Sequence, residues 1–177
     1  EMARLAGQRA RDATVTGLRD IRWDRTVPVP DAGVSVRIDT DPSDDGVACR
    51  MVADTEAARC VAVFNTPPSV PPVDIAAERA AAIQHATRAD LDALDRGTVR
   101  LGPSFAGFDE LWVAEASALS WVGPWDASDG CVLPPRLMDA AIQTGAALLA
   151  RADGPSFRLR YPAGVAAISI LGPPPTE

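Results

Sequence analysis

The sequence predicts an α+β fold, in which helices cover antiparallel sheets, and two observations support this prediction. First, a segment with apolar residues at helical spacing is followed by closely spaced segments in which apolar and polar residues alternate. Second, short strands and a strongly amphipathic helix recur in the second half of the chain. Because a sheet with one apolar face needs a helix to cover it, we expect two units built from helix and sheet.

The first half is expected to form one helix and four strands. Residues 1–11 place apolar side chains on one helical face and contain many good helix formers. No capping residue precedes them, so we expect this helix to begin upstream. Alternation predicts strands at 18–29, 34–38, 47–52 and 58–64, with a turn rich in Pro, Ser, Asp and Gly at 41–46.

A proline-rich segment separates the two halves. Residues 65–72 contain four prolines, which cannot pair within a central strand. Asp74 is a favourable N-cap for an Ala-rich helix at 75–86, and a second short helical segment is expected at 90–94. The predicted organisation is a first unit at 1–64, a linker with a helix at 65–98 and a second unit at 99–177.

The second half is expected to contain a long helix among short strands. Pro134 and Pro135 precede residues 136–150, whose apolar side chains form one broad stripe. Such a stripe is typical of a helix that packs on a sheet. Strands are expected at 111–113, 118–122, 157–160 and 164–171.

Composition excludes several classes of protein. The chain has 177 residues, a net charge of −7 and a pI of about 4.7, which argues against non-specific binding to nucleic acid. No apolar run approaches the ~20 residues that span a bilayer. The chain has no basic and apolar leader, so we expect a cytoplasmic protein.

The cysteines and the histidine give no sign of a metal site. Cys49, Cys60 and Cys131 have no C-x-x-C spacing, and we interpret them as small buried side chains in a reducing compartment. His85 is the only histidine, which is too few for a multi-histidine metal site. We interpret it as a solvated or capping residue of the Ala-rich helix.

Two stretches have the composition of a site. Residues 101–108 read Leu-Gly-Pro-Ser-Phe-Ala-Gly-Phe, in which two glycines permit tight backbone geometry and two phenylalanines offer an apolar wall. Residues 133–143 place Asp139 and Gln143 four apart, and so on one helical face. An apolar environment favours the protonated form of a carboxyl, whereas a helix N-terminus favours the charged form, and the sequence leaves this balance open. Asp139 is also a candidate N-cap of its helix.

The order of these features resembles the dehydratase domain of modular polyketide synthases. The resemblance rests on the proline-rich linker, on G-P-S-F-x-G at 102–107 and on L-P-x-x-x-M-D-A-A-x-Q at 133–143. Residues 1–3 and 18–23 are similar to the start of that family's first helix and to its next strand. The resemblance implies a double hotdog fold, in which two long helices are each wrapped by a curved antiparallel sheet, incomplete here at both ends.

The resemblance also implies a reaction and its residues. Asp139 corresponds to the acid that protonates the leaving β-hydroxyl of a β-hydroxyacyl thioester, and Gln143 to its hydrogen-bonding helper. The substrate-binding residues implied are Leu101, Gly102, Pro103, Phe105 and Pro135. The product is a trans-α,β-enoyl thioester, formed without a metal or organic cofactor. The implied partners are an acyl carrier protein, whose phosphopantetheine carries the substrate, neighbouring synthase domains and a second copy of the domain.

Departures from the family pattern define the alternatives. The family's catalytic histidine lies in an H-x-x-x-G-x-x-x-x-P motif that this sequence does not contain, so we expect that histidine outside it. Leu101 stands where the family usually has tyrosine. A non-catalytic scaffold domain, a double-bond-shifting relative and a relative that forms rings by oxa-Michael addition remain alternatives. Arg136 is a candidate contact for a phosphopantetheine phosphate, or else a solvated side chain.

Overall fold

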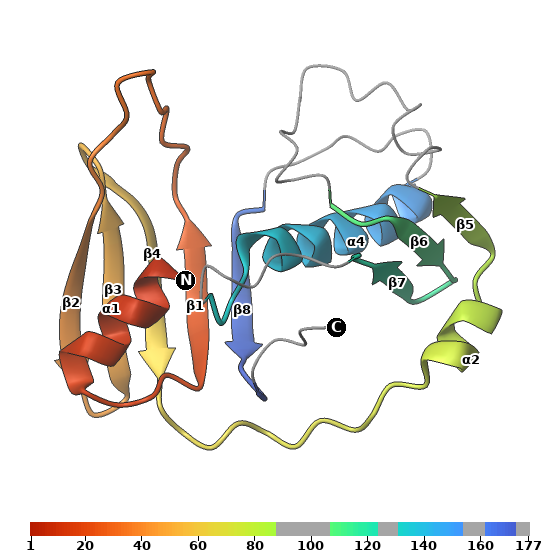
Figure 1. Cartoon of the computed structure of the whole chain (residues 1–177), viewed down its shortest axis with the longest axis horizontal. Helices are drawn as coiled ribbons and strands as arrows, with labels where there is room; N and C mark the ends of the chain where they lie inside the picture. Colours follow the sequence, from red (N-terminus) through yellow and green to blue (C-terminus); the bar gives the residue numbers. More distant parts are fainter. Residues whose placement is uncertain (88–106, 124–130, 154–161, 173–177) are drawn as a thin grey trace. The chain divides into compact units, whose positions relative to one another are not determined.

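The computed structural model, drawn in Figure 1, forms two compact units. It describes residues 1–87, 107–123, 131–153 and 162–172. Unit 1 comprises Glu1–Val70 and Tyr161–Pro173, and unit 2 comprises Pro71–Arg160 and Pro174–Glu177.

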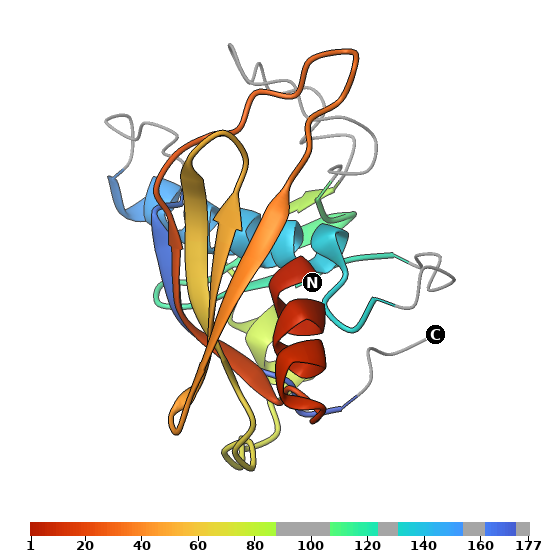
Figure 2. The same cartoon turned by 90° about the vertical axis from the view of Figure 1, so that its left-hand side faces the viewer.

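Unit 1 is a five-stranded antiparallel sheet with a helix against one face. Its elements are α1 (Met2–Arg11), β1 (Gly17–Trp23), β2 (Arg37–Ser43), β3 (Gly46–Val52), β4 (Glu56–Val63) and β8 (Gly164–Ser169). The strands lie in the order β2-β3-β4-β1-β8, and Figure 2 shows α1, in red, on one side of the sheet, where it contacts β2, β3 and β4. The helix and the antiparallel meander expected from the sequence are confirmed.

Small and apolar side chains join α1 to the sheet. Val15, Val47, Cys49 and Ala62 are each no more than 2% exposed. Gly7 of α1 lies so close to β4 that an added Cβ would be 2.6 Å from the Cβ of Ala62. The absence of a side chain at Gly7 therefore permits the close approach of helix and sheet.

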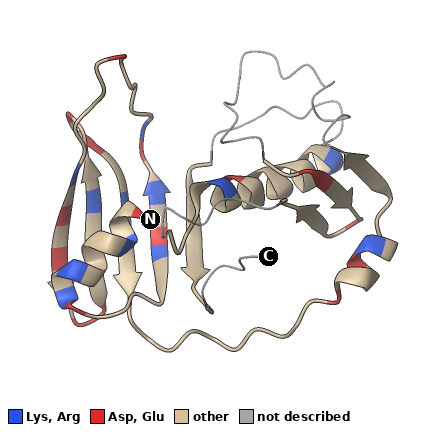
Figure 3. Ribbon diagram, viewed as in Figure 1, with Lys and Arg blue, Asp and Glu red and all other residues tan. Residues whose placement is uncertain are grey.

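Strand β2 differs from its predicted position for a reason of pairing. The sequence predicted a strand at 34–38 and a turn at 41–46, but β2 continues until Ser43 pairs with Gly46 of β3. Only two residues remain in the turn, as in a tight hairpin. Pro42 is tolerated because β2 is an edge strand, and the charged residues visible along β2 in Figure 3 are typical of an edge.

Unit 2 contains a three-stranded antiparallel sheet that is covered by a long helix. Its described elements are α2 (Ile75–Ala80), β5 (Gln84–Thr87), β6 (Glu110–Val113), β7 (Ala118–Trp121) and α4 (Pro135–Asp153). Phe108, Leu111 and Val113 form a buried cluster, against which Ala147 and Leu148 of α4 pack. Leu148 of the predicted apolar stripe thus packs on the sheet, whereas Leu149 of the same stripe is 62% exposed.

The helix predicted at 75–86 is wrong in its second half. Asp74 does cap α2, because its side chain accepts a hydrogen bond of 3.0 Å from the N–H of Ala77. The helix nevertheless ends at Ala80, and β5 follows and pairs with β6, with His85 opposite Trp112. The hydrogen bonds and ring stacking available to β5 outweigh the helical propensity of this segment.

The last described strand belongs to the sheet of unit 1. Strand β8 pairs antiparallel with β1, so that Leu18 lies opposite Ile168. The sequence predicted this segment as part of the second unit, at 99–177. Periodicity predicts that a segment is a strand, but it does not identify the strand's partner.

Several predictions fall outside the described residues. They are the short helical segment at 90–94, most of the stretch at 101–108 and the strand at 157–160. Within the described ranges, no helix combines the length and the apolar character needed to cross a membrane.

Candidate active site

The first turns of α4 place Asp139 inside the helix. Pro135 is the first helical residue, where its fixed φ and missing N–H are favourable. The carbonyl of Pro134 accepts the N–H of Met138 at 3.1 Å, which closes the first turn. Asp139 follows this turn, so the interpretation of Asp139 as an N-cap is wrong.

Asp139 and Gln143 are joined by a hydrogen bond on one face of α4. Nε2 of Gln143 donates to Oδ2 of Asp139, and both side chains are partly buried. A carboxylate offers only acceptors, so the amide must turn its nitrogen toward Asp139. The prediction that residues four apart share this face is confirmed. The arrangement orients a carboxyl group, as proton transfer requires.

Gly107 lies against the amide of Gln143. Its φ is +67°, in the left-handed region that favours glycine. A Cβ added to Gly107 would lie 2.6 Å from Oε1 of Gln143. The sequence predicts tight backbone geometry at Gly107 but not this contact, because no local pattern pairs a loop glycine with a particular helix position.

Two sets of hydrogen bonds tie this region together. The hydroxyls of Ser120 and Thr144 are 2.7 Å apart, and Thr144 Oγ1 is also 2.7 Å from the carbonyl oxygen of Ala140. Thr144 therefore donates to Ala140 and accepts from Ser120, which links α4 to β7. Asp109 accepts the N–H of Gly123 at 2.6 Å through Oδ2. The ends of β6 and β7 are thus joined beside Gly107.

The other predicted site residues have mixed outcomes. Pro135 is described and exposed. Arg136 is partly buried, and its Nε is buried without a hydrogen-bond partner among the described atoms. The remaining predicted substrate-binding residues, Leu101, Gly102, Pro103 and Phe105, lie outside the described residues. Phe108, considered for the apolar wall, belongs to the core of unit 2, where it is 5% exposed.

His85 belongs to an exposed cluster on the sheet of unit 2, and not to a helix as predicted. Its Nε2 is 3.0 Å from Oε2 of Glu110, and its ring stacks on Trp112 with centroids 5.0 Å apart and planes 16° from parallel. The guanidinium carbon of Arg79 lies 4.3 Å from the centroid of the Trp112 ring. The pairing of His85 with Trp112 across β5 and β6 explains the ring stacking, and Arg79 of α2 adds a cation–π contact.

Cys49 and Cys60 lie opposite each other on β3 and β4 and are buried as predicted. A hydrogen bond between the two thiols lowers the pKa of Cys49 and raises the pKa of Cys60, and burial raises the pKa of Cys60 further. Cys60 therefore keeps its proton at neutral pH.

Among the described residues, no group of three or more His, Cys, Asp or Glu is placed to hold a metal ion.

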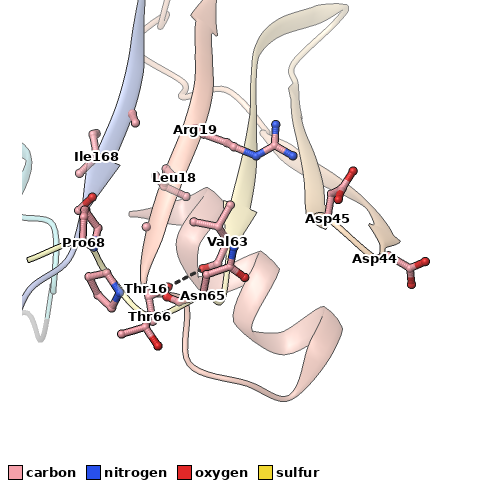
Figure 4. Close-up of a pocket in the computed structure, with 14 residues that line it drawn as sticks. Thr16, Leu18, Arg19, Asp44, Asp45, Val63, Asn65, Thr66, Pro68 and Ile168 are labelled. Carbon is pink, nitrogen blue, oxygen red and sulfur yellow. Dashed lines mark hydrogen bonds between the residues drawn. The ribbon is translucent and has the colours of Figure 1, made fainter.

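Unit 1 has a surface hollow of about 420 Å³ between β1, β8 and the start of the proline-rich segment. Figure 4 shows that Thr16, Arg19, Asn65 and Ile168 line it, and Thr16 Oγ1 donates to the carbonyl of Asn65 at 2.5 Å. None of the residues predicted for catalysis or substrate binding lines this hollow.

Comparison with known proteins gives similarity in structure only. No protein-family model matches the sequence, and no curated protein matches it. A pyran synthase domain from module nine of the sorangicin pathway is 23% identical with a TM-score of 0.77, and the alignment covers 94% of this chain and 64% of that domain. The dehydratase domain of MlnD from Bacillus amyloliquefaciens is 12% identical with a TM-score of 0.79, covering 96% of this chain and 67% of that one.

The dehydratase domain from the CurF module of the curacin polyketide synthase is similar to the same degree. It is 18% identical with a TM-score of 0.79, and the alignment covers 98% of this chain and 67% of that domain. The chain is therefore an α+β protein with a hotdog fold. That fold is the double hotdog of polyketide synthase dehydratase domains, as the sequence resemblance implied. The chain spans 64–67% of the length of these three domains.

Proposed function

We propose that this chain supplies the general acid of a dehydratase that acts on β-hydroxyacyl thioesters in polyketide synthesis. The observation that carries the proposal is the hydrogen bond from Gln143 to Asp139 on α4. It joins the two residues that the dehydratase pattern assigns to acid and helper. The fold shared with polyketide synthase dehydratase domains supports the proposal.

In the proposed reaction, Asp139 gives its proton to the β-hydroxyl as the C–O bond breaks, and water leaves. A base removes the α-proton, and the electrons of that C–H bond form the Cα=Cβ double bond. The thioester carbonyl makes the α-proton acidic, so an acid and a base suffice and no oxidant or reductant is needed. The hydrogen bond to Oδ2 holds the plane of the carboxyl, and Oδ1 of Asp139 carries the proton to the substrate.

The proposal assigns the basic half of the reaction to a histidine that this sequence does not contain. His85 is engaged by Glu110 and Trp112 on the sheet of unit 2. The same proposal includes an acyl carrier protein as donor of the substrate, neighbouring synthase domains and a second copy of the domain as partners.

The test measures dehydration of a β-hydroxyacyl N-acetylcysteamine thioester by the chain, with imidazole added as an external base. We expect the enoyl thioester to form, and Asp139→Asn to lower its rate by about 10²–10⁴-fold, as for loss of a general acid. Glu115→Gln, which alters an exposed carboxylate in the turn between β6 and β7, is the matched control and retains the rate. An Asp139→Asn rate equal to that of the wild type contradicts the proposal.

The same assay distinguishes the alternatives. A scaffold domain forms no enoyl product under any of these conditions, either as the wild type or as Asp139→Asn. The similarity to a pyran synthase domain favours ring closure as the second candidate reaction. A substrate with a distal hydroxyl tests it, because oxa-Michael addition gives a cyclic ether in place of the open-chain enoyl thioester.

A further inference from the structure

We propose that Gly107 is a positioning residue. Because it has no side chain, the Gln143 amide can lie against it with Nε2 facing Asp139. This inference rests on the proposed function, because it concerns the orientation of the proposed acid. It adds a loop residue that acts on Asp139 through Gln143, the side chain that lies nearest to the Cβ position of Gly107.

The geometry of Gly107 is specific to the Gln143 amide. A Cβ on Gly107 would lie 2.6 Å from Oε1, 3.1 Å from Cδ and 3.3 Å from Nε2 of Gln143, so it would meet the whole amide group. Only a residue without a side chain leaves this space to the amide. With Oε1 against Gly107, the nitrogen is the atom turned to Asp139, as the hydrogen bond requires.

Contacts on both sides hold Gly107 at its distance from α4. Two residues after Gly107, the N–H of Asp109 donates to the carbonyl of Trp121 at 2.8 Å, and the carboxylate of Asp109 accepts the N–H of Gly123 at 2.6 Å. Next to Gln143, Thr144 bonds to Ser120 of β7. The loop at Gly107 and the helix α4 are thus both hydrogen-bonded to the hairpin of β6 and β7, and the Gln143 amide lies between the loop and α4.

A methyl group at Gly107 is expected to displace the amide while the fold is retained. The nearest atoms to that methyl are the end of a flexible side chain and not backbone. Gln143 can therefore rotate away at small cost, but the rotation breaks its bond to Asp139. Asp139 keeps its place on α4, but its carboxyl group loses the Gln143 hydrogen bond that orients it.

The first experiment compares Gly107→Ala with Gly33→Ala in the dehydration assay. Gly33 also has a left-handed φ, of +81°, but nothing lies within 4 Å of its Cβ position. Both variants place alanine at a positive φ, and only the new methyl group of Gly107→Ala meets an amide. We expect Gly107→Ala to lower kcat by about 10²-fold, as a misplacement near 1 Å does, and Gly33→Ala to retain it.

A double-mutant cycle separates positioning from a general structural effect. In a Gln143→Ala background the amide is gone, so we expect Gly107→Ala to cause no further loss of kcat. If Gly107→Ala lowers kcat by the same factor in both backgrounds, it does not act through Gln143, and the inference is overturned.

A measurement by NMR makes the inference independent of activity. In the ¹⁵N-labelled wild-type chain we expect a nuclear Overhauser effect between the α-protons of Gly107 and the side-chain amide protons of Gln143, assigned with Gln143→Ala. We expect the amide signal to move in Gly107→Ala and to stay in Gly33→Ala. Absence of the Overhauser effect overturns the inference even if Gly107→Ala does not fold. If these signals behave as expected but the wild type forms no enoyl product, the proposed function fails and the positioning role stands.

Discussion

Replacing Gly7 by alanine tests how closely α1 packs on β4. Alanine favours a helix over glycine by about 1 kcal/mol, so propensity alone predicts a more stable protein. The new Cβ would lie 2.6 Å from the Cβ of Ala62, and neither atom can move by a change of rotamer. Overpacking of this kind costs about 1–3 kcal/mol. We therefore expect Gly7→Ala to lower the free energy of unfolding by about 1 kcal/mol.

The measurement is urea unfolding followed by circular dichroism, with Gly145→Ala as the matched control. Gly145 also lies inside a helix, but nothing is within 4 Å of its Cβ position. We expect Gly145→Ala to raise the free energy of unfolding by about 0.5–1 kcal/mol. The same substitution thus has opposite signs at the two positions, and only the space around the new methyl group differs.

A second variant tests whether Ala62 is the residue with which the new methyl group of Gly7→Ala clashes. Ala62→Gly alone removes a buried methyl and places glycine in a strand, which costs about 1–2 kcal/mol. Combined with Gly7→Ala it makes room for the new methyl, so the double variant should be more stable than the sum of the single effects by about 1 kcal/mol. Additivity within about 0.5 kcal/mol, or a stabilising Gly7→Ala, would refute the reasoning.

Three further predictions concern thiols, pH and the link between α4 and β7. Because Cys49 and Cys60 are buried and the pKa of Cys60 is raised, mass spectrometry should find both unmodified by iodoacetamide in the native protein and modified in urea. The Arg37 guanidinium lowers the pKa of Asp39, so the stability that Asp39→Asn removes is present at pH 7 and shrinks as the pH falls through that lowered pKa, as urea titrations at pH 7 and pH 3 would show. Thr144→Val should cost about 1–2 kcal/mol in urea unfolding, because it leaves a hydroxyl of β7 without its partner.

Each of these predictions has an outcome that contradicts it. Modification of the buried thiols at equal rates in native protein and in urea would show that they are accessible. An effect of Asp39→Asn that is the same at both pH values would show that its carboxylate gains nothing from Arg37. A Thr144→Val variant as stable as the wild type would show that the bond to Ser120 contributes nothing, and Thr144→Ser, which keeps the hydroxyl and loses only a methyl group, is the control.

The long helix and its site pair were predictable because both depend on local spacing. The apolar stripe predicted a helix at 136–150, and the structure has it at Pro135–Asp153. Residues four apart share a helical face whatever surrounds them, so the pairing of Asp139 with Gln143 followed from the sequence. The rejection of Asp139 as an N-cap needed the true start of the helix, which local patterns leave uncertain by a few residues.

The segment at 84–87 shows where local reasoning fails. Its neighbours are rich in alanine, and propensity favours a helix there. Pairing with β6 and stacking of His85 on Trp112 supply contacts that a helix at this position does not have. The partner strand lies more than twenty residues away, so no short window of sequence contains both halves of the interaction.

The sequence by itself determined which residues share a face, because helix and strand periods are properties of a few consecutive residues. It determined the meander strands β3 and β4, the long helix α4 and the alignment of Asp139 with Gln143. Tertiary structure alone decided that β8 pairs with β1, that His85 meets Glu110 and that Gly107 makes room for the Gln143 amide. These contacts join segments distant in the chain, and they form where packing and hydrogen bonding outweigh the entropy lost in bringing the segments together.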